Sequence, residues 1–375
     1  MPGPHIVVIG LGAMGSAVLC QLARRGVRAT GIEQFAIGHA NGSSHGPTRM
    51  IRLAHFENSS YVPLLRRAYA LWRELEAIAG QTLVVSTGIA EIGPPEGELI
   101  RGTLAAVAHY GLAHEVLDAK ALMQLYPNFK LPEKFVAVLQ PDGGYIEAAG
   151  AIEANIRIAT AAGATVRTFE TVAAIEPHAT GVRITTGRDV IDADGAVVAA
   201  GPWMGKLLPQ LRLPLRVTRQ VVGWFEPADA EQFAADRFPV FILETQHGHH
   251  YGFPAYGRSG IKFAKHHHLQ EAVDVDGYRR TVSAEDEAAI RGPLGDYLPA
   301  ANGRLLDAQT CLYTMTPDDT FIIDRMPGYA HVVVASPCCG HGFKFSPVIG
   351  EILADLVTSG TTAHDLAPFR LQRFE

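Results

Sequence analysis

The stretch HIVVIGLGAMGSAVLCQLARRG, residues 5–26, decides the fold of this chain. A β-branched apolar run is followed by Gly10, Gly12 and Gly15, and then by an apolar pattern with helical spacing. This order predicts a strand, a tight turn and a helix. Gly10 would permit the turn, Gly12 would let backbone N–H groups approach a pyrophosphate, and Gly15 would let the helix pack closely. The stretch therefore predicts a dinucleotide-binding unit in which the helix N-terminus faces the phosphates.

The next predicted strand, VRATGIE, ends at Glu33, about 20 residues after the glycines. A carboxylate at this position accepts hydrogen bonds from a ribose hydroxyl and disfavours a 2′-phosphate. The glycines and Glu33 together predict an α/β, Rossmann-like domain. They do not separate FAD from NAD.

Two later segments, residues 194–203 and 331–342, also have strand character and break at glycine. The second leads into a helical pattern, SPVIGEILADLV, whose N-terminus would point at whatever the preceding loop binds. We therefore expect one nucleotide-binding sheet built from the beginning, middle and end of the chain. This domain would comprise residues 1–84, 148–214 and 320–375, and a second, mostly antiparallel α+β substrate domain would comprise residues 85–147 and 215–319.

The composition is that of an enzyme-sized globular chain. Its 375 residues are 47% hydrophobic and 19% charged, enough to bury the cores of two domains. Lys and Arg total 32 against 38 Asp and Glu, a net charge of −6, and the basic residues are scattered, so a nucleic-acid partner is not expected. No apolar run approaches the roughly 18 to 20 residues of a membrane span. The N-terminus lacks a signal-peptide pattern and four cysteines make a poor disulfide framework, so we expect a cytoplasmic protein without membrane association.

A segment rich in Gly, Ser and His follows Glu33 and carries Arg49 and Arg52 where a helix is expected to begin. So long a loop favours a segment lying along an extended cofactor, with an arginine facing a carboxylate; the alternative is a solvated loop with surface arginines. Cys311 and Lys344 are expected in loops marked by Pro and Gly. A lone cysteine is most often a buried, inert thiol, so the residues alone leave the role of Cys311 open.

Histidines cluster at residues 247–250 (HGHH) and 266–268 (HHH). A metal site is not expected there, because neighbouring strand residues point to opposite faces and no acidic or cysteine partner has ligand spacing. We expect these histidines in polar loops.

Beyond the opening glycine motif, the chain carries fragments that occur together in one family. It resembles, from end to end, the monomeric sarcosine oxidases and N-methyltryptophan oxidases, flavoenzymes that oxidise the secondary amine of N-methyl amino acids. The resemblance rests on the opening motif and on SSHGPTRMIR, YVPL, YGFP, CLYTMTPDDTFIID, GHGFKF and DLAPFRLQRF, which begin at residues 43, 61, 251, 311, 340 and 365. It implies a glutathione-reductase-type FAD-binding domain covered by a substrate domain.

The resemblance implies a covalently bound FAD. The cysteine that matches Cys311 carries the flavin through a thioether, and His45 and Arg49 flank the ring. The lysine that matches Lys344 lies beside the pyrimidine edge of the ring and the substrate carboxylate, in the loop that also contains Gly340 and Gly342. A cation at that edge would stabilise the negative charge that develops there during hydride transfer.

The resemblance also implies which residues surround the substrate. The lysine that matches Lys262 lies near the reactive nitrogen of the flavin and activates dioxygen; the alternative is a surface lysine on an edge strand. Arg52 is the candidate for the substrate carboxylate, because a guanidinium can bind two oxygens at once. Tyr251 and His266 would line the pocket.

These implications predict a monomeric FAD-dependent oxidase that converts an N-methyl amino acid, water and dioxygen to the free amino acid, formaldehyde and hydrogen peroxide. Glycine, a cyclic imino acid or another small amine is an alternative substrate. An NAD-dependent dehydrogenase or a non-catalytic nucleotide-binding protein is the alternative from another class, in which Cys311 and the GHGFK loop would have no role. Leu53, His55, Cys338 and Cys339 depart from the family pattern near the pocket, so the substrate side chain stays open.

Overall fold

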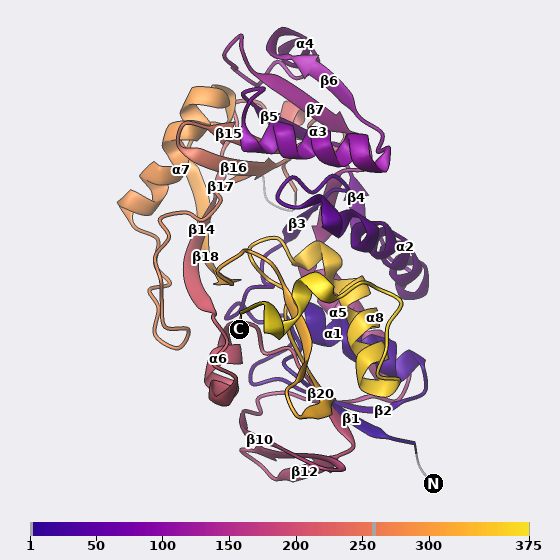
Figure 1. Cartoon of the computed structure of the whole chain (residues 1–375). Helices are drawn as coiled ribbons and strands as arrows, with labels where there is room; N and C mark the ends of the chain where they lie inside the picture. Colours follow the sequence, from indigo (N-terminus) through magenta and orange to yellow (C-terminus); the bar gives the residue numbers. More distant parts are fainter. Residues whose placement is uncertain (1–2, 257–259, 375) are drawn as a thin grey trace.

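The structure, a computed structural model, describes residues 3–256 and 260–374. Within these residues the two largest sheets have six and eight strands. In Figure 1 the six-stranded sheet and the helices packed on it fill the lower part of the view, and the eight-stranded sheet lies in the upper part. Segments from the beginning, middle and end of the chain meet in the six-stranded sheet, as the glycine-broken strands predicted.

The six-stranded sheet is the nucleotide-binding type that the opening stretch predicts. Its strands are β1 (His5–Ile9), β2 (Arg28–Ile32), β9 (Thr165–Arg167), β13 (Gly195–Val198), β19 (Ile322–Met326) and β20 (Tyr329–Ser336). They lie in the order β19-β20-β13-β1-β2-β9, with an antiparallel pair at β19–β20 and parallel pairs elsewhere.

Both faces of this sheet are covered. Ile6 and Val8 of β1 pack into the core on one face, under α1 (Ala13–Arg24), α2 (Val62–Ala79), α5 (Ala148–Ala161) and α8 (Ser346–Thr358). Val7 and Ile9 face the other side, where a small antiparallel sheet and a short helix cover them, namely β10 (Val172–His178), β11 (Gly181–Thr186), β12 (Val190–Ala193) and α6 (Met204–Leu207). Burial on both faces explains why the strand is a continuous apolar run.

The turn between β1 and α1 depends on its glycines. Gly10 has φ +86°, in the left-handed region that favours glycine. A Cβ atom at Gly15 would lie 1.6 Å from the carbonyl oxygen of Gly10, so a side chain at this position would push the helix away from the strand. Both glycines therefore allow the close strand-to-helix packing that the spacing predicts.

The eight-stranded sheet is mostly antiparallel, as predicted, with one parallel pair at β5–β15. Its strands, in chain order, are β5 (Ile89–Gly93), β6 (Glu115–Asp118), β7 (Val136–Gln140), β14 (Arg216–Phe225), β15 (Val240–Thr245), β16 (Gly248–Phe253), β17 (Ile261–Lys265) and β18 (Leu305–Met315). They lie in the order β18-β14-β17-β16-β15-β5-β7-β6. An aromatic-rich core joins the sheet to α4 (Ala119–Leu125) and α7 (Ala284–Tyr297), while α3 (Glu98–Tyr110) packs on β5 and β7. Among the described residues, every helix is too short or too polar to cross a membrane.

The prediction that a helix begins at Arg49 and Arg52 is wrong. A second small sheet, in the order β3-β8-β4, contains β3 (Thr48–Ile51), β4 (Val84–Ser86) and β8 (Gly144–Glu147). Arg49 lies in β3 opposite Ile146, and Arg52 follows the end of that strand. The strand forms because β8, far away in the sequence, supplies its hydrogen-bonding partner, which a local pattern cannot reveal.

The prediction that Cys311 and the clustered histidines lie in loops is also wrong in part. Cys311 lies inside β18, paired with Gln220 of β14, because the β-favouring run that includes it continues to Met315 before the Pro-containing turn begins. His249 and His250 belong to β16, and His250 is fully buried. The second cluster, residues 266–268, does form a turn, directly after β17.

Candidate active site

Two cavities share lining residues and together form one extended binding site. The first, of about 180 Å³, is lined from both large sheets, and the second, of about 370 Å³, lies along the β1–α1 turn. Ser43, Ser44, Ala199 and Gly201 line both. An elongated site that starts at a Rossmann turn and ends between two sheets has the shape that an extended dinucleotide requires.

The second cavity contains the residues predicted for the nucleotide end. Gly10, Gly12 and Glu33 line it. Glu33 is buried, and its carboxylate accepts hydrogen bonds from the backbone N–H groups of Leu11 (2.9 Å) and Phe35 (3.1 Å), which fix it beside the turn. These features fit the phosphates and ribose of a bound dinucleotide.

Cys311 lies in the first cavity beside two cations. It is 8% exposed, and Arg49 and Lys262 line the same cavity. Burial raises the pKa of the Cys311 thiol, while the charges of Arg49 and Lys262 oppose this and favour the thiolate. The thiol therefore faces a cavity that also carries the charges needed to activate it.

Arg49 is held by backbone carbonyls of its own loop. Its guanidinium donates to the carbonyl oxygens of Thr48 (2.9 Å), Ser43 (3.2 Å) and His45. His45 is buried, burial lowers its pKa to about 4, and its Nε2 has no hydrogen-bond partner. A neutral imidazole with an unpartnered nitrogen beside the cavity fits a residue that contacts a bound ring.

The Lys262 side chain is almost completely removed from solvent. Its Nζ donates to the carbonyl oxygen of Thr48 (2.7 Å) and contacts Thr48 Oγ1 (3.2 Å), and it lies 4.3 Å from the centre of the Phe253 ring. The side chain is 5% exposed, and burial together with Arg49 holds its pKa well below the usual lysine range. The alternative of a surface lysine is therefore wrong, because β17 is an interior strand between β14 and β16.

Arg52 is buried and paired with two carboxylates. Its guanidinium contacts Glu57 at 2.7 and 2.9 Å and Glu91 at 3.3 Å, and it donates to the carbonyl oxygen of Ala54 (2.6 Å). Burial alone would raise the pKa of Glu57, but Arg52 and His55 hold it well below the usual range. Arg52 and Glu57 both line the cavity, so this ion pair faces whatever binds there.

Glu91 supports Arg52 from the protein interior. It lies on β5, is fully buried, and its Oε2 accepts hydrogen bonds from Thr103 (2.9 Å) and Gln140 (2.6 Å). Gln140 in turn accepts from the backbone N–H of Ala54 (3.0 Å), so the network also fixes the loop after Arg52. Burial raises the pKa of Glu91 to about 7, although Arg52 opposes this.

Lys344 lies in a short 3-10 helix, Phe343–Phe345, directly before α8. It is 4% exposed, its Nζ donates to the carbonyl oxygen of His341 (2.8 Å), and burial and Arg52 lower its pKa to about 7. A Cβ atom at Gly340 would lie 2.7 Å from the Tyr313 ring and 2.8 Å from the His266 ring. Glycine at this position therefore lets the loop approach the cavity.

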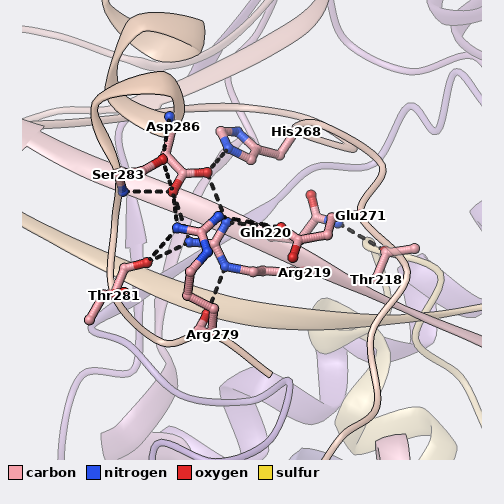
Figure 2. A network of polar contacts seen from close by, with 9 residues as sticks. All are labelled: Thr218, Arg219, Gln220, His268, Glu271, Arg279, Thr281, Ser283 and Asp286. Atoms are coloured by element: carbon pink, nitrogen blue, oxygen red, sulfur yellow. Dashed lines mark hydrogen bonds and ion pairs between the residues drawn. The ribbon is translucent and has the colours of Figure 1, made fainter. Parts of the chain in front are cut away.

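Tyr251, His266 and Tyr313 form an aromatic wall of the cavity. His266 Nδ1 lies 3.3 Å from the hydroxyl of Tyr313, and burial raises the pKa of Tyr251 to about 12. The turn that carries His266 is anchored by a polar network remote from the cavity, in which His268 Nε2 lies 2.9 Å from Asp286 and Asp286 pairs with Arg219 (Figure 2). The network therefore sets the position of this wall.

The structure thus places every predicted site residue along the two cavities, except that Gly15 acts from behind the turn. Sequence reasoning missed Tyr313, Glu57, Glu91 and His341. The period of two along a strand would have placed Tyr313 on the same face as Cys311, and His341 stands inside the GHGFKF fragment. Glu91 gave no local signal, because only the sheet brings β5 under Arg52. Among the described residues, no cluster of three or more His, Cys, Asp or Glu side chains could hold a metal ion.

Comparison with known proteins identifies the family. A family model described as FAD dependent oxidoreductase matches residues 5–356. The chain belongs to this family. FAD is accordingly its cofactor, and the dinucleotide-shaped pair of cavities agrees with it.

The curated relatives confirm the resemblance drawn from the motifs. The chain is 39% identical over 373 residues to the monomeric sarcosine oxidase of Bacillus sp. (strain NS-129), which covers 98% of this chain and 96% of that protein. It is 34% identical over 371 residues to the N-methyl-L-tryptophan oxidase of Salmonella typhi, which covers 98% of each.

Solved structures confirm the fold class. NikD, an unusual amino acid oxidase essential for nikkomycin biosynthesis, matches with a TM-score of 0.85 and 27% identity over 99% of this chain and 98% of that chain. Glycine oxidase from Geobacillus kaustophilus matches with a TM-score of 0.82 over 99% of each chain at 21% identity, which bears on the fold alone.

Proposed function

We propose that this protein is an FAD-dependent oxidase of secondary amines that demethylates an N-methyl amino acid, giving the free amino acid, formaldehyde and hydrogen peroxide. The proposal is supported by relatives that are named sarcosine oxidase and N-methyl-L-tryptophan oxidase. The single observation that carries it is the meeting of Cys311, Lys262, Arg52 and Lys344 in one cavity. The enzyme is a cytoplasmic monomer in this proposal, and the six- and eight-stranded sheets form its FAD and substrate domains.

When bound, FAD accepts a hydride equivalent from the methyl carbon of the substrate and passes electrons to dioxygen. The residues of the chain orient the reactants and supply charge. Arg52 and Lys344 hold the substrate carboxylate. The partly exposed Glu57 moves away from Arg52 when this carboxylate binds. Tyr251 and His266 close the pocket against the substrate and exclude water. Lys262 supplies the positive charge where dioxygen is reduced.

Cys311 is the attachment point of the flavin in this proposal. Its sulfur lies in the cavity, and Arg49 and Lys262 favour the thiolate that forms the bond. His45 and Arg49 contact the ring, and the loop of Gly340 and Gly342 brings Lys344 to its edge. Gly10, Gly12, Gly15 and Glu33 hold the nucleotide end.

The proposal is tested with purified holoenzyme. Protein precipitated with acid should stay yellow, and a Cys311→Ala variant should release its flavin into the supernatant. Peroxide is measured with a panel of N-methyl amino acids and, for comparison, with glycine and a cyclic imino acid. The N-methyl amino acids should yield peroxide and an equal amount of formaldehyde. Free flavin in the wild-type supernatant would contradict the covalent link. A peroxide yield confined to glycine or the imino acid would replace the proposed substrate class.

A further inference from the structure

Three short polar gaps connect the substrate cavity with the surface. Glu57 Oε2 lies 3.0 Å from His55 Nδ1, and His55 Nε2 lies 3.3 Å from His341 Nδ1. His341 Nε2 lies 3.2 Å from the carbonyl oxygen of Asp319. Glu57 lines the cavity with a side chain that is 25% exposed, His55 is fully buried, and Asp319 is exposed. The two imidazoles therefore bridge a carboxylate in the cavity and a carbonyl at the surface.

The hydrogens in these gaps can be counted. The carbonyl of Asp319 only accepts, so His341 must carry a hydrogen on Nε2. A neutral His341 then has a lone pair on Nδ1 and accepts from the Nε2–H of His55. A neutral His55 is left with a lone pair on Nδ1, which faces the carboxylate of Glu57, and a carboxylate also only accepts. Three gaps need three hydrogens, and two neutral imidazoles supply two.

Two observations place the missing hydrogen between His55 and Glu57. His55 Nδ1 is buried without a hydrogen-bond partner, although the carboxylate lies within reach. Burial lowers the pKa of His55 to about 4, with Glu57 acting in the opposite direction, so the imidazole is neutral in the ligand-free protein. This gap can therefore take up one proton.

The surrounding charges link proton uptake to anion binding. Arg52, from the end of β3, and Lys344, from the 3-10 helix before α8, both lower the pKa of His55. Tyr61, directly before α2, stacks on the His55 ring with centroids 4.8 Å apart, and burial raises its pKa further above neutrality, so it adds no charge. A carboxylate bound at Arg52 would offset the two cations and raise the proton affinity of His55.

The other charged groups near His55 act on it through Arg52, Lys344 and His341. Glu91 faces Arg52 from β5, and Glu57 and Glu91 both raise the pKa of Lys344. Burial, His55 and Lys344 hold the pKa of His341 well below its usual range, so this imidazole too is neutral without a ligand.

We propose that Glu57, His55 and His341 form a proton-accepting cluster that takes up one proton when a substrate carboxylate binds and holds it on His55 Nδ1, facing Glu57. The proton source rests on the proposed function, since an N-methyl amino acid carries a secondary ammonium group that must lose one proton before its carbon is oxidised. The N–H bond of the ammonium breaks, an N–H bond forms at His55, and Glu57 is the counter-ion. No electrons are transferred in this step.

The test measures protons directly and needs no turnover. Propionate, a carboxylate without an amine, is added to oxidised holoenzyme in weak buffer with a pH indicator near pH 6, at concentrations that saturate the change in the flavin spectrum. A carboxylate nearby raises a pKa by about 1 to 3 units, so wild-type protein should take up as much as about one proton per active site, at a pH where Lys344 and Glu91, with pKa values of about 7, already carry most of their protons. Absence of a spectral change would contradict the carboxylate site itself.

Two variants remove the acceptor in different ways. In Glu57→Gln the amide can donate to His55 Nδ1 and fill the gap without a proton, and in His55→Phe the acceptor is gone. Both should lose the same part of the uptake, whereas His5→Gln, a change at a buried histidine of β1, should keep it. Equal uptake in wild type and Glu57→Gln overturns the proposal, even if His55→Phe fails to fold.

A second readout uses the substrate. The rate of anaerobic flavin reduction at saturating N-methyl amino acid should fall at low pH with an apparent pKa about one unit higher in His341→Gln than in wild type, a tenfold change in proton equilibrium. An unchanged pH profile would overturn the role of His341. Failure of every N-methyl amino acid to reduce the flavin would contradict the proposed function and leave the propionate result unaffected.

Discussion

Two buried arginines of this molecule have opposite environments. Arg219, on β14, is fully buried and surrounded by partners (Figure 2). Its guanidinium binds both oxygens of Asp286 at 2.8 and 2.9 Å and donates to the carbonyls of Arg279 and Thr281. Burial alone would raise the pKa of Asp286, but Arg219, Ser283 and further donors lower it far below the usual range.

Arg52 is just as buried, but its partners are not held in one fixed charge state. Glu57 is partly exposed to the cavity, Glu91 has a pKa raised by burial to about 7, and Lys344 close by has a pKa lowered by burial to about 7. Glu91 Oε1 and His55 Nδ1 lack hydrogen-bond partners.

The comparison separates structural from functional burial of charge. A pair such as Arg219 and Asp286, in which the guanidinium and the carboxylate both have fixed partners, holds one protonation state over a wide pH range and stabilises one geometry. A cluster with unmatched atoms and pKa values near neutrality can exchange a partner or a proton at low cost. The following predictions test this distinction, beginning with the largest expected effect.

Asp286→Ala should have the largest effect, and on stability. It leaves the buried guanidinium of Arg219 without its main counter-ion, which costs about 3 to 5 kcal/mol of the free energy of unfolding. Thermal and denaturant unfolding measure this loss. Asp192→Ala, which breaks the exposed pair with Arg183, is the matched control and should change stability far less, because solvent screens this pair. Similar losses of unfolding free energy in the two variants would contradict a structural role of the network.

Lys262→Met should act on chemistry and not on stability. Loss of the buried amino group, which supplies positive charge where dioxygen is reduced, should slow reoxidation of the flavin by oxygen by about 10²- to 10³-fold. Anaerobic reduction by substrate should slow far less, and the melting temperature should stay the same or rise. Rapid mixing separates the two half-reactions, and Lys265→Met on the same strand is the control. If the rates of both half-reactions fall equally, Lys262 positions the reactants and does not activate oxygen.

Arg52→Ala should weaken binding of an N-methyl amino acid to the oxidised enzyme by roughly 10- to 150-fold, because a charge-assisted contact contributes about 1.5 to 3 kcal/mol. An N-methyl amine that lacks a carboxylate should bind almost unchanged. Arg52→Lys should recover only part of the loss, since an ammonium cannot bind two oxygens in a plane. If the carboxylate-free amine weakens as much, Arg52 acts through the flavin or the fold.

Glu91→Gln should give an effect on stability that is visible as a change with pH. The folded-state pKa of Glu91 is raised from its ordinary value of 4.5 to about 7, so the folded protein keeps a proton that the unfolded chain loses. Glu91 therefore costs stability progressively as pH rises from about 4.5 to 7, by at most about 1.4 kcal/mol per pH unit.

The Glu91→Gln variant does not lose this stability, because an amide does not ionise. Its stability relative to wild type should rise with pH across that window and level off above it, as measured by melting temperatures in parallel buffers. Glu115→Gln, at an exposed position, should show no such trend. A difference that is constant with pH would mean that folding does not raise the pKa of Glu91.

Sequence reasoning reached the fold class and the family because both rest on local patterns. The β1 strand, the glycine turn and α1 are encoded within residues 5–26, and fragments such as GHGFKF carry their identity in consecutive residues. It failed at β3, where Arg49 was expected in a helix, and at Cys311, expected in a loop. In both cases a strand partner distant in sequence, β8 or β14, decided the local structure.

By itself, then, the sequence determined that the chain binds a dinucleotide through β1, Gly10, Gly12 and Glu33, since φ preference, side-chain size and apolar periodicity act between near neighbours. Only the tertiary structure decided the charge of the active site. Glu91 comes from β5, His341 from the loop after β20, and Arg52 from the end of β3, and their pKa values and hydrogen-bond partners exist only once folding removes these groups from water and sets their distances.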